Sequence, residues 1–187
     1  MNKMLLIIDA QYDFINGSLA VTSARDKMIA LFDMLEKKKN DYDCVVFTAD
    51  WHPFNHMSFI KNDGSWPTHC VQYTSGAAIF NPLLHVVSDK EKVFVLTKGE
   101  DPTTEEYSIL ANEKSRQELL EIIGKNDIHQ IDICGIANEF CVFNTVKDFV
   151  ETSEHKDKLC ILKDYIAAIE NENVLFDYAK DNGIKMV

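Results

Sequence analysis

Long hydrophobic runs and clustered positive charge are both missing from this sequence. No apolar stretch approaches the roughly 20 residues that a membrane-spanning helix needs. The 19 Lys and Arg residues are outnumbered by 30 Asp and Glu, which gives a net charge of −11, and the only basic run spans residues 37–39. Because binding to nucleic acid or to an anionic membrane needs clustered basic residues, neither is an expected partner.

Cysteine is scarce and odd in number, with five in the chain. The apolar run at Met4–Ile8 leads into acidic residues without a small-residue cleavage site, so it predicts a strand and not a signal peptide. An odd number of cysteines without a secretory signal favours reduced thiols and a cytoplasmic protein. Three cysteines lie in apolar, strand-like runs and are expected to pack in the core: Cys44, Cys134 and Cys160.

Short apolar, β-branched runs alternate with amphipathic stretches along the chain. The runs predict strands at Met4–Ile8, Cys44–Thr48, Val93–Thr97, Ile131–Gly135, Leu159–Leu162 and Ile184–Val187. The amphipathic stretches predict helices at Arg25–Lys38, Glu113–Lys125, Glu139–Val150 and Asn173–Lys180. This alternation implies a mostly parallel sheet covered on both faces. With 187 residues and no internal repeat or linker, one three-layer α/β/α domain over 1–187 is expected.

Polar or reactive residues follow four of the predicted strands. Asp9, Asp50, Lys98 and the segment Gly135–Cys141 lie at or just past the strand ends. In open α/β sheets, ligands bind beyond the carboxyl ends of the strands, so these positions are expected to converge on one edge. The stretch 50–82 holds most of the proline, both tryptophans and three of the six histidines, and loops of this length are often functional.

Cys141 is a candidate nucleophile. A helix is expected to begin near Glu139, which places the thiol in the first turn, where free N–H groups and the helix dipole lower its pKa. The same N–H groups could hold an oxyanion. A buried structural cysteine is the alternative. Asp9 and Lys98 each end an apolar strand, where each alone is more often a cap or a solvated end, but at one sheet edge they could pair.

Asp50 and His52 are candidate metal ligands. Residues i and i+2 after a strand point to the same side, and His69 could supply a third ligand. Two imidazoles and a carboxylate leave open coordination positions, as catalytic metal sites do, and they accept Zn, Fe or Mn. Most Asp-x-His pairs bind no metal, so the site is a hypothesis at this point. Pro53 argues against a continuous helix through His52 and His56, so His56 is expected to have a supporting role.

Five segments carry a family resemblance: Asp9–Phe14 with Asn16–Leu19, Asp50–Phe59, Trp66–Gln72, Lys98–Gly99 with Tyr107–Ser108, and Gly135–Val142. They resemble the opening motif, metal loop, third-ligand segment, lysine region and nucleophile motif of nicotinamidases in the isochorismatase-like hydrolase family. The similarity runs, with gaps, from Met4 to about Asp164. It implies a Rossmann-like fold and hydrolysis of nicotinamide to nicotinate and ammonia in NAD salvage, with pyrazinamide as a second substrate.

The resemblance also implies roles for single residues. It implies that Asp9, Lys98 and Cys141 are catalytic, and that the N–H groups of Ala137 and Cys141 form an oxyanion hole. It implies one divalent metal ion, Zn in the first place with Fe or Mn as alternatives, with these ligands: Asp50, His52 and His69. It implies ring contacts from three aromatic residues: Phe14, Trp66 and Tyr107. A cis peptide bond at Ile136–Ala137 and a homo-oligomer are further expectations.

The sequence departs from the family pattern at two places. Tyr73 stands where glycine is expected, and the loop from Phe59 to Trp66 is short. Some members take an additional acidic metal ligand from that loop, but Asp63 is not a clean match. Two alternatives remain open at this point. One is a related cysteine hydrolase with another small-molecule substrate, and the other is a non-catalytic binding or assembly homologue, a class that usually loses the nucleophile.

Overall fold

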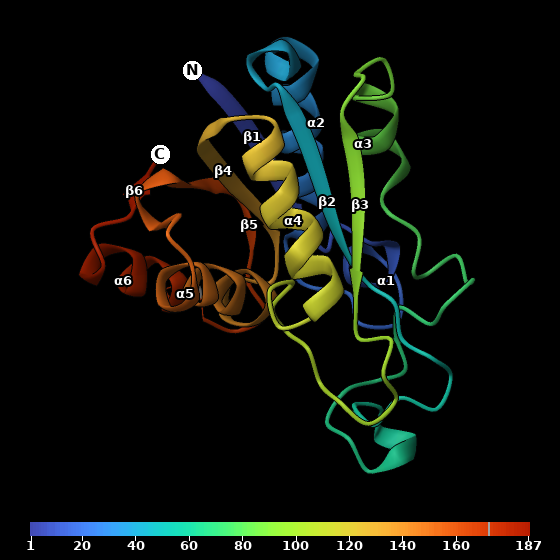
Figure 1. Ribbon diagram of the computed structural model, residues 1–187. Helices are drawn as coiled ribbons and strands as arrows, with labels where there is room; N and C mark the ends of the chain where they lie inside the picture. Colours follow the sequence, from blue (N-terminus) through green and yellow to red (C-terminus); the bar gives the residue numbers. More distant parts are fainter. Residues whose placement is uncertain (172) are drawn as a thin grey trace.

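A six-stranded sheet forms the centre of the protein (Figure 1). The computed structural model describes residues 1–171 and 173–187. All strand pairs of this sheet are parallel, in the order β3-β2-β1-β4-β5-β6. The strands are β1 (Asn2–Ile8), β2 (Cys44–Asp50), β3 (Val93–Lys98), β4 (Ile128–Ile136), β5 (Leu159–Ala167) and β6 (Lys185–Met186).

Helices cover both faces of the sheet, as the alternating pattern predicted (Figure 1). They are α1 (Tyr12–Ile15), α2 (Ala24–Lys38), α3 (Asn81–Val86), α4 (Glu113–Lys125), α5 (Phe143–Thr152) and α6 (Val174–Asp181). Because parallel crossovers are right-handed, α2 and α3 lie on one face and α4, α5 and α6 on the other. The predicted three-layer α/β/α fold is therefore confirmed. Within residues 1–171 and 173–187, every helix is too short or too polar to span a lipid bilayer.

Short elements account for most differences from the predicted elements. Helices α1 and α3 were not predicted, because four and six residues are too few to show a helical period. The predicted helix at Glu139–Val150 is divided into a π-helical turn, Asn138–Val142, and α5. Short 3₁₀ turns occupy Lys39–Asp41, Ile60–Asn62 and Lys156–Lys158.

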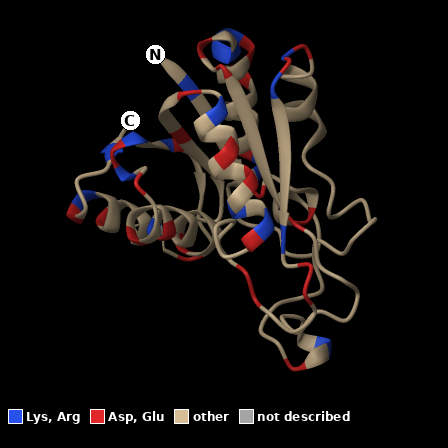
Figure 2. Cartoon of the chain, viewed as in Figure 1, with Lys and Arg blue, Asp and Glu red and all other residues tan. Residues whose placement is uncertain are grey.

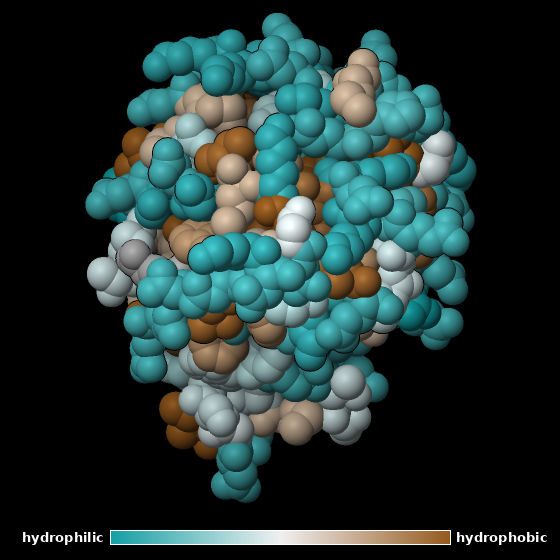
Figure 3. All heavy atoms as spheres, turned by 90° about the vertical axis from the view of Figure 1, so that its left-hand side faces the viewer, coloured by the Kyte–Doolittle hydropathy of each residue, from teal (hydrophilic) through white to brown (hydrophobic). Residues whose placement is uncertain are grey.

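The strands supply the centre of the hydrophobic core. Every residue of β2 is buried, and α2 turns Met28, Leu31 and Leu35 inward at helical spacing. Charged residues lie mainly on the outer helices and loops, while the strands hold few of them (Figure 2). The face that carries α5 and α6 is mostly hydrophilic, with only scattered apolar atoms (Figure 3). The three cysteines predicted to pack in the core are buried: Cys44, Cys134 and Cys160.

Gly135 lets β4 approach β1 closely near the carboxyl edge. Its φ is +127°, and a Cβ atom there would lie 2.0 Å from the carbonyl oxygen of Ile8. No side chain fits at this position without moving the β1 backbone. Gly135 therefore brings the end of β4 next to the end of β1, where Asp9 follows.

Candidate active site

Four strand ends converge on one edge of the sheet, as the sequence predicted. Asp50 and Lys98 are the last residues of β2 and β3 and are register partners. Asp9 follows β1, and Ala137 follows β4. The chain crosses to the other side of β1 between β3 and β4, so this edge lies at the point where the strand order reverses. Ligands bind at such points in open α/β sheets.

Lys98 lies between two carboxylates and a thiol. Its Nζ is 3.0 Å from Asp9 Oδ2 and 3.6 Å from Cys141 Sγ, and it pairs with Asp50 Oδ1. Thr48 donates its hydroxyl to Asp9 Oδ1 at 2.6 Å. Asp9 Oδ2 is ion-paired with Lys98, and a contact between the Asp9 carboxylate and the Cys141 thiol contributes to the pKa shifts of both groups. One oxygen of Asp9 is thus available to a proton from Cys141.

Burial controls the ionisation of these groups. It raises the pKa of Asp9 while Lys98 opposes the rise, and it raises the pKa of the Cys141 thiol well above its usual range, again against Lys98. Burial disfavours the charge of Lys98, but Asp50 and Asp9 outweigh it and raise the ammonium pKa. The shift of the thiol pKa is therefore opposite to the predicted lowering, because burial, Asp9 and Asp50 together outweigh Lys98. The thiol at rest keeps its proton and needs a base.

The turn that carries Cys141 differs from an ordinary helix start. The N–H of Val142 donates to the carbonyl of Ala137 at 3.1 Å, which is the spacing of a π turn, and α5 begins only at Phe143. The peptide bond between Ile136 and Ala137 is cis, which confirms that expectation. Ala137 and Cys141 both line one pocket.

Asp50, His52 and His69 form a compact group of potential metal ligands. One donor atom from each lies within 4.8 Å of the others. The Nε2 atoms of His52 and His69 are 3.6 and 3.9 Å from Asp50 Oδ2. The Nδ1 atoms contact backbone carbonyls, Gly99 at 3.0 Å and Pro67 at 2.7 Å. With Nδ1–H donating to these carbonyls, both Nε2 lone pairs face the same point, which is how metal-binding histidines are oriented.

The electrostatics of this group fit a divalent cation. Burial raises the pKa of Asp50, but Lys98 and His52 outweigh it, so the carboxylate is ionised. Burial lowers the pKa of His69. Burial also disfavours charged His52, but the contact with Asp50 raises the pKa of that ring. A carboxylate and two imidazoles with a common focus match the donor set of divalent transition metals.

His56 and Asp63 lie outside the group. The Nδ1 of His56 contacts Ser58 Oγ at 2.7 Å and its Nε2 contacts the carbonyl of Thr104 at 3.0 Å, so both ring nitrogens are used. Its ring stacks 4.1 Å from that of His52, which suits the supporting role expected for it. Asp63 is exposed and ends a 3₁₀ turn with a φ of +64°.

Two polar side chains hold the site loops together. Gln11 donates to the carbonyls of Asp50 and Ala77, each at 2.8 Å, and accepts the N–H of Asp50 at 2.8 Å. Asp13 accepts the N–H of Cys70 at 2.7 Å. Tyr73, which replaces an expected glycine, has a φ of +64°, in the region that favours glycine.

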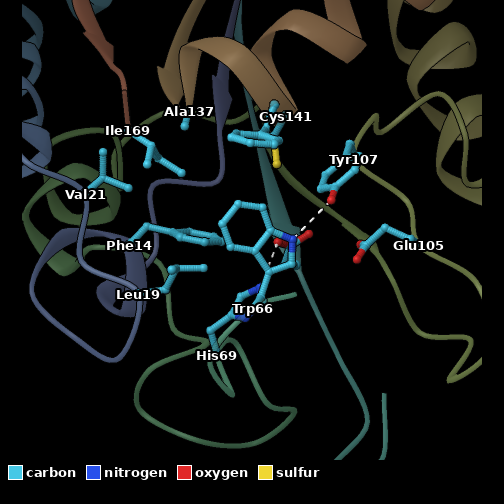
Figure 4. A pocket seen from close by; sticks show the side chains of 12 residues that line it. Phe14, Leu19, Val21, Trp66, His69, Glu105, Tyr107, Ala137, Cys141 and Ile169 are labelled. Atoms are coloured by element: carbon cyan, nitrogen blue, oxygen red, sulfur yellow. Dashed lines mark hydrogen bonds and ion pairs between the residues drawn. The ribbon is translucent and has the colours of Figure 1, made fainter. Parts of the chain in front are cut away.

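The three predicted ring-contacting aromatics line the same pocket as Cys141 (Figure 4). Phe14 comes from α1, and Trp66 donates its indole N–H to the Tyr107 hydroxyl at 3.1 Å. Sequence reasoning missed five further lining residues: Leu19, Val21, Glu105, Phe140 and Ile169. Phe140 could have been found from its place beside Cys141. Ile169 follows β5 and reaches the pocket only through the tertiary fold, so no local signal indicates it.

Fold and site together define an enzyme of the hydrolase class. The family model of the isochorismatase domain matches residues 3–152, and the chain therefore belongs to the isochorismatase family. It is 37% identical over 153 residues to the nicotinamidase/pyrazinamidase of Mycobacterium tuberculosis. The match covers 79% of this chain and 78% of that relative.

Solved structures agree with this assignment. The pyrazinamidase of Pyrococcus horikoshii in complex with zinc is 32% identical, with a TM-score of 0.83 over 100% of this chain and 99% of that one. The yeast nicotinamidase bound to the inhibitor nicotinaldehyde is 26% identical, with a TM-score of 0.86 over 99% of both chains. The predicted family resemblance is confirmed.

Proposed function

We propose that this protein hydrolyses nicotinamide to nicotinate and ammonia, and pyrazinamide likewise, through a thioester on Cys141. The observation that carries the proposal is that residues of both the cysteine cluster and the candidate metal group line one pocket. Cys141 of the Asp9–Lys98–Cys141 cluster lines it, and so do Asp50 and His69 of the candidate metal group. The similarity to nicotinamidases and pyrazinamidases supports the choice of amide.

Asp9 and Lys98 activate the thiol in this proposal. Asp9 Oδ2 takes the Cys141 proton, and the Lys98 ammonium, 3.6 Å from the sulfur, stabilises the thiolate that forms. The thiolate attacks the carboxamide carbon, and the backbone N–H groups of Ala137 and Cys141 hold the oxyanion. One such donor is worth roughly 3 kcal/mol in other hydrolases. The proton on Asp9 then goes to the departing ammonia.

The second half of the reaction uses the same base. Asp9, ionised again after ammonia leaves, accepts a proton from the water that attacks the thioester carbon. The carbon–sulfur bond breaks, the carboxylate product forms and Cys141 recovers its proton. The walls formed by Phe14, Trp66 and Tyr107 hold the ring so that its carboxamide faces the sulfur.

A divalent ion held by Asp50, His52 and His69 would supply Lewis-acid chemistry toward a ring nitrogen or a water. We propose Zn²⁺, with Fe or Mn as alternatives that the same donors accept. We further propose that the hydrolase domain spans 1–187, since β5 and β6 extend the sheet beyond residue 152. A role in NAD salvage in the cytoplasm and a homo-oligomeric state complete the proposal.

An ammonia-release assay tests the function directly. The metal-loaded protein is given nicotinamide, pyrazinamide and simple carbamoyl compounds in parallel, and isochorismate, which contains no nitrogen, is followed by release of pyruvate. Turnover of the two ring amides with a Cys141-dependent burst supports the proposal. Turnover of another amide but of neither ring amide favours the related cysteine hydrolase instead. Lack of turnover of any compound favours the non-catalytic homologue.

A further inference from the structure

Glu139 lies two residues before Cys141 and has no role in the mechanism above. Its Oε1 accepts the N–H groups of Ile169, Glu170 and Asn171 at 3.0, 2.6 and 3.0 Å, and its Oε2 lies 3.1 Å from the N–H of Ile169. Three successive backbone N–H groups around one anion form a nest. The anion that fills this nest is a side chain of the nucleophile turn.

The carboxylate is charged at neutral pH. Burial raises the pKa of Glu139, but the N–H groups of Glu170, Asn171 and Ile169 outweigh burial and lower it. Hydrogen bonds to an ionised acceptor are roughly twice as strong as neutral ones. The hydrogen bonds of the nest are therefore strong, although the nest lies in an exposed position on the loop after β5.

A second side chain of the same turn holds the other end of this segment. Asn138 Oδ1 accepts the N–H of Leu175, in the first turn of α6, at 3.1 Å. The turn that carries Cys141 is thus bonded to both ends of the segment that joins β5 to α6. Residues 169–171 and the start of α6 are therefore held at a fixed position relative to Cys141.

Ile169 is the residue through which this contact reaches the substrate. Its side chain lines the pocket on the side of Ala137, while its own N–H is held by Glu139 (Figure 4). We propose that Glu139 is a positioning residue, which fixes the Ile169 wall relative to Cys141 and so sets the fit of ring-bearing amides. The inference rests on the proposed function for its substrate and on the nest contacts for its geometry.

Glu139→Gln keeps the shape of the side chain and removes its charge. One acceptor oxygen becomes an NH₂ group that faces N–H donors, so the nest loses strength. The expected result is a KM for nicotinamide about three- to tenfold higher with kcat within about twofold, because the wall affects binding more than the reacting groups. Glu151→Gln is the matched control. It makes the same chemical change at an exposed residue near the end of α5, away from the nest.

Two further measurements separate positioning from a merely structural role. Amide hydrogen exchange at residues 169–171 should accelerate in Glu139→Gln and not in Glu151→Gln. Alkylation of Cys141 by iodoacetamide, which needs no ring pocket, should stay within about twofold of the wild type. In a double-mutant cycle, Ile169→Ala should raise KM similarly, and Glu139→Gln should add little on top of it.

Contrary results are equally distinct. Faster exchange with an unchanged KM would overturn the positioning role, and so would a fall in Cys141 alkylation that parallels kcat. Full additivity in the cycle would show that Glu139 does not act through Ile169. If the wild type hydrolyses no ring amide, the proposed function fails. Calorimetric binding of nicotinate to the same variants then decides the positioning role alone, with a three- to tenfold weaker binding supporting it.

Discussion

Asp50 and Lys98 end neighbouring strands as register partners, and their side chains form a buried ion pair. The other oxygen of the same carboxylate faces the Nε2 atoms of His52 and His69. One carboxylate therefore connects the ammonium group beside Cys141 to the candidate metal ligands. A change at Asp50 is expected to affect both halves of the site.

Asp50→Asn should lower both metal content and stability. The variant leaves Lys98 buried with Asp9 as its remaining anionic partner, and an uncompensated buried charge is costly. We expect a loss of roughly 2–3 kcal/mol in the free energy of unfolding, measured by urea denaturation after chelation so that metal binding does not contribute. Elemental analysis of the untreated variant should show little bound metal.

The control for this experiment is Asp89→Asn. Asp89 pairs with Lys39 at 2.8 Å on the surface, where both side chains are in contact with water. Exposed ion pairs contribute little to stability because water and salt screen them, so this variant should stay close to the wild type. Equal losses in the two variants would contradict the importance assigned to the buried pair.

Cys141→Ala should abolish turnover and leave metal content unchanged. Loss of a covalent nucleophile lowers kcat by about 10⁴-fold or more in comparable hydrolases. Cys70→Ala should retain substantial activity, because Cys70 is fully buried, its pKa is raised well above the usual range by burial, and it does not line the pocket. An inactive Cys70→Ala beside an active Cys141→Ala would show that the wrong thiol was chosen.

The sheet and the convergence of its edge residues could be predicted from sequence because they follow local patterns. Apolar runs define the strands, and carboxyl ends of parallel strands meet at one edge, which placed Asp9, Asp50 and Lys98 together. The state of the Cys141 thiol could not be predicted that way. Its pKa depends on burial by segments distant in sequence, and the helix-dipole rule treats only the local turn.

The pocket wall shows the same limit. Glu139 and Ile169 are 30 positions apart, and neither belongs to a periodic pattern that would pair them. Only the return of the chain after β5 brings the N–H groups of the loop to the carboxylate. By contrast, Phe14, Trp66 and Tyr107 were predicted from resemblance to family motifs, and all three line the pocket.

His52→Ala and His69→Ala should each lower bound metal and raise KM for nicotinamide. Each ring contributes one Nε2 to the group around Asp50 Oδ2, so each variant removes a donor. His56→Ala should affect metal content less, because both nitrogens of His56 contact protein groups. Elemental analysis that shows full occupancy in His69→Ala would remove that residue from the site.

Gly99→Ala should weaken metal binding without touching a ligand. A Cβ at Gly99 would lie 2.5 and 2.6 Å from Cε1 and Nδ1 of His52, and its φ of +74° disfavours alanine. We expect a loss of roughly 1–2 kcal/mol in unfolding free energy and a lower metal affinity by competition with a chelator. Gly124→Ala is the control, since Gly124 lies within α4 and has open space around it. Alanine is the better helix former, so this variant should raise the free energy of unfolding by about 0.5–1 kcal/mol.

Glu105 places a second carboxyl group, in addition to that of Asp50, on the wall of the pocket, and this group is turned toward the cavity (Figure 4). The proposed substrate is a neutral amide and the product is a carboxylate. Burial, together with the charge of Asp50, raises the pKa of Glu105, while His52 and Lys98 oppose the rise. A second anion in the pocket should therefore bind less well than a neutral ring of the same shape.

Glu105→Gln should tighten nicotinate binding relative to nicotinamide. Two unit charges roughly 8–16 Å apart interact by about 1–2 kcal/mol at an effective dielectric of about 20, so a gain of about five- to thirtyfold is expected. Product-inhibition constants for nicotinate, divided by KM for nicotinamide, measure this ratio at low ionic strength. Glu118→Gln, on the exposed side of α4, controls for the change in net charge. An unchanged ratio in Glu105→Gln would contradict this prediction. It would mean that the charge of Glu105 does not distinguish nicotinate from nicotinamide.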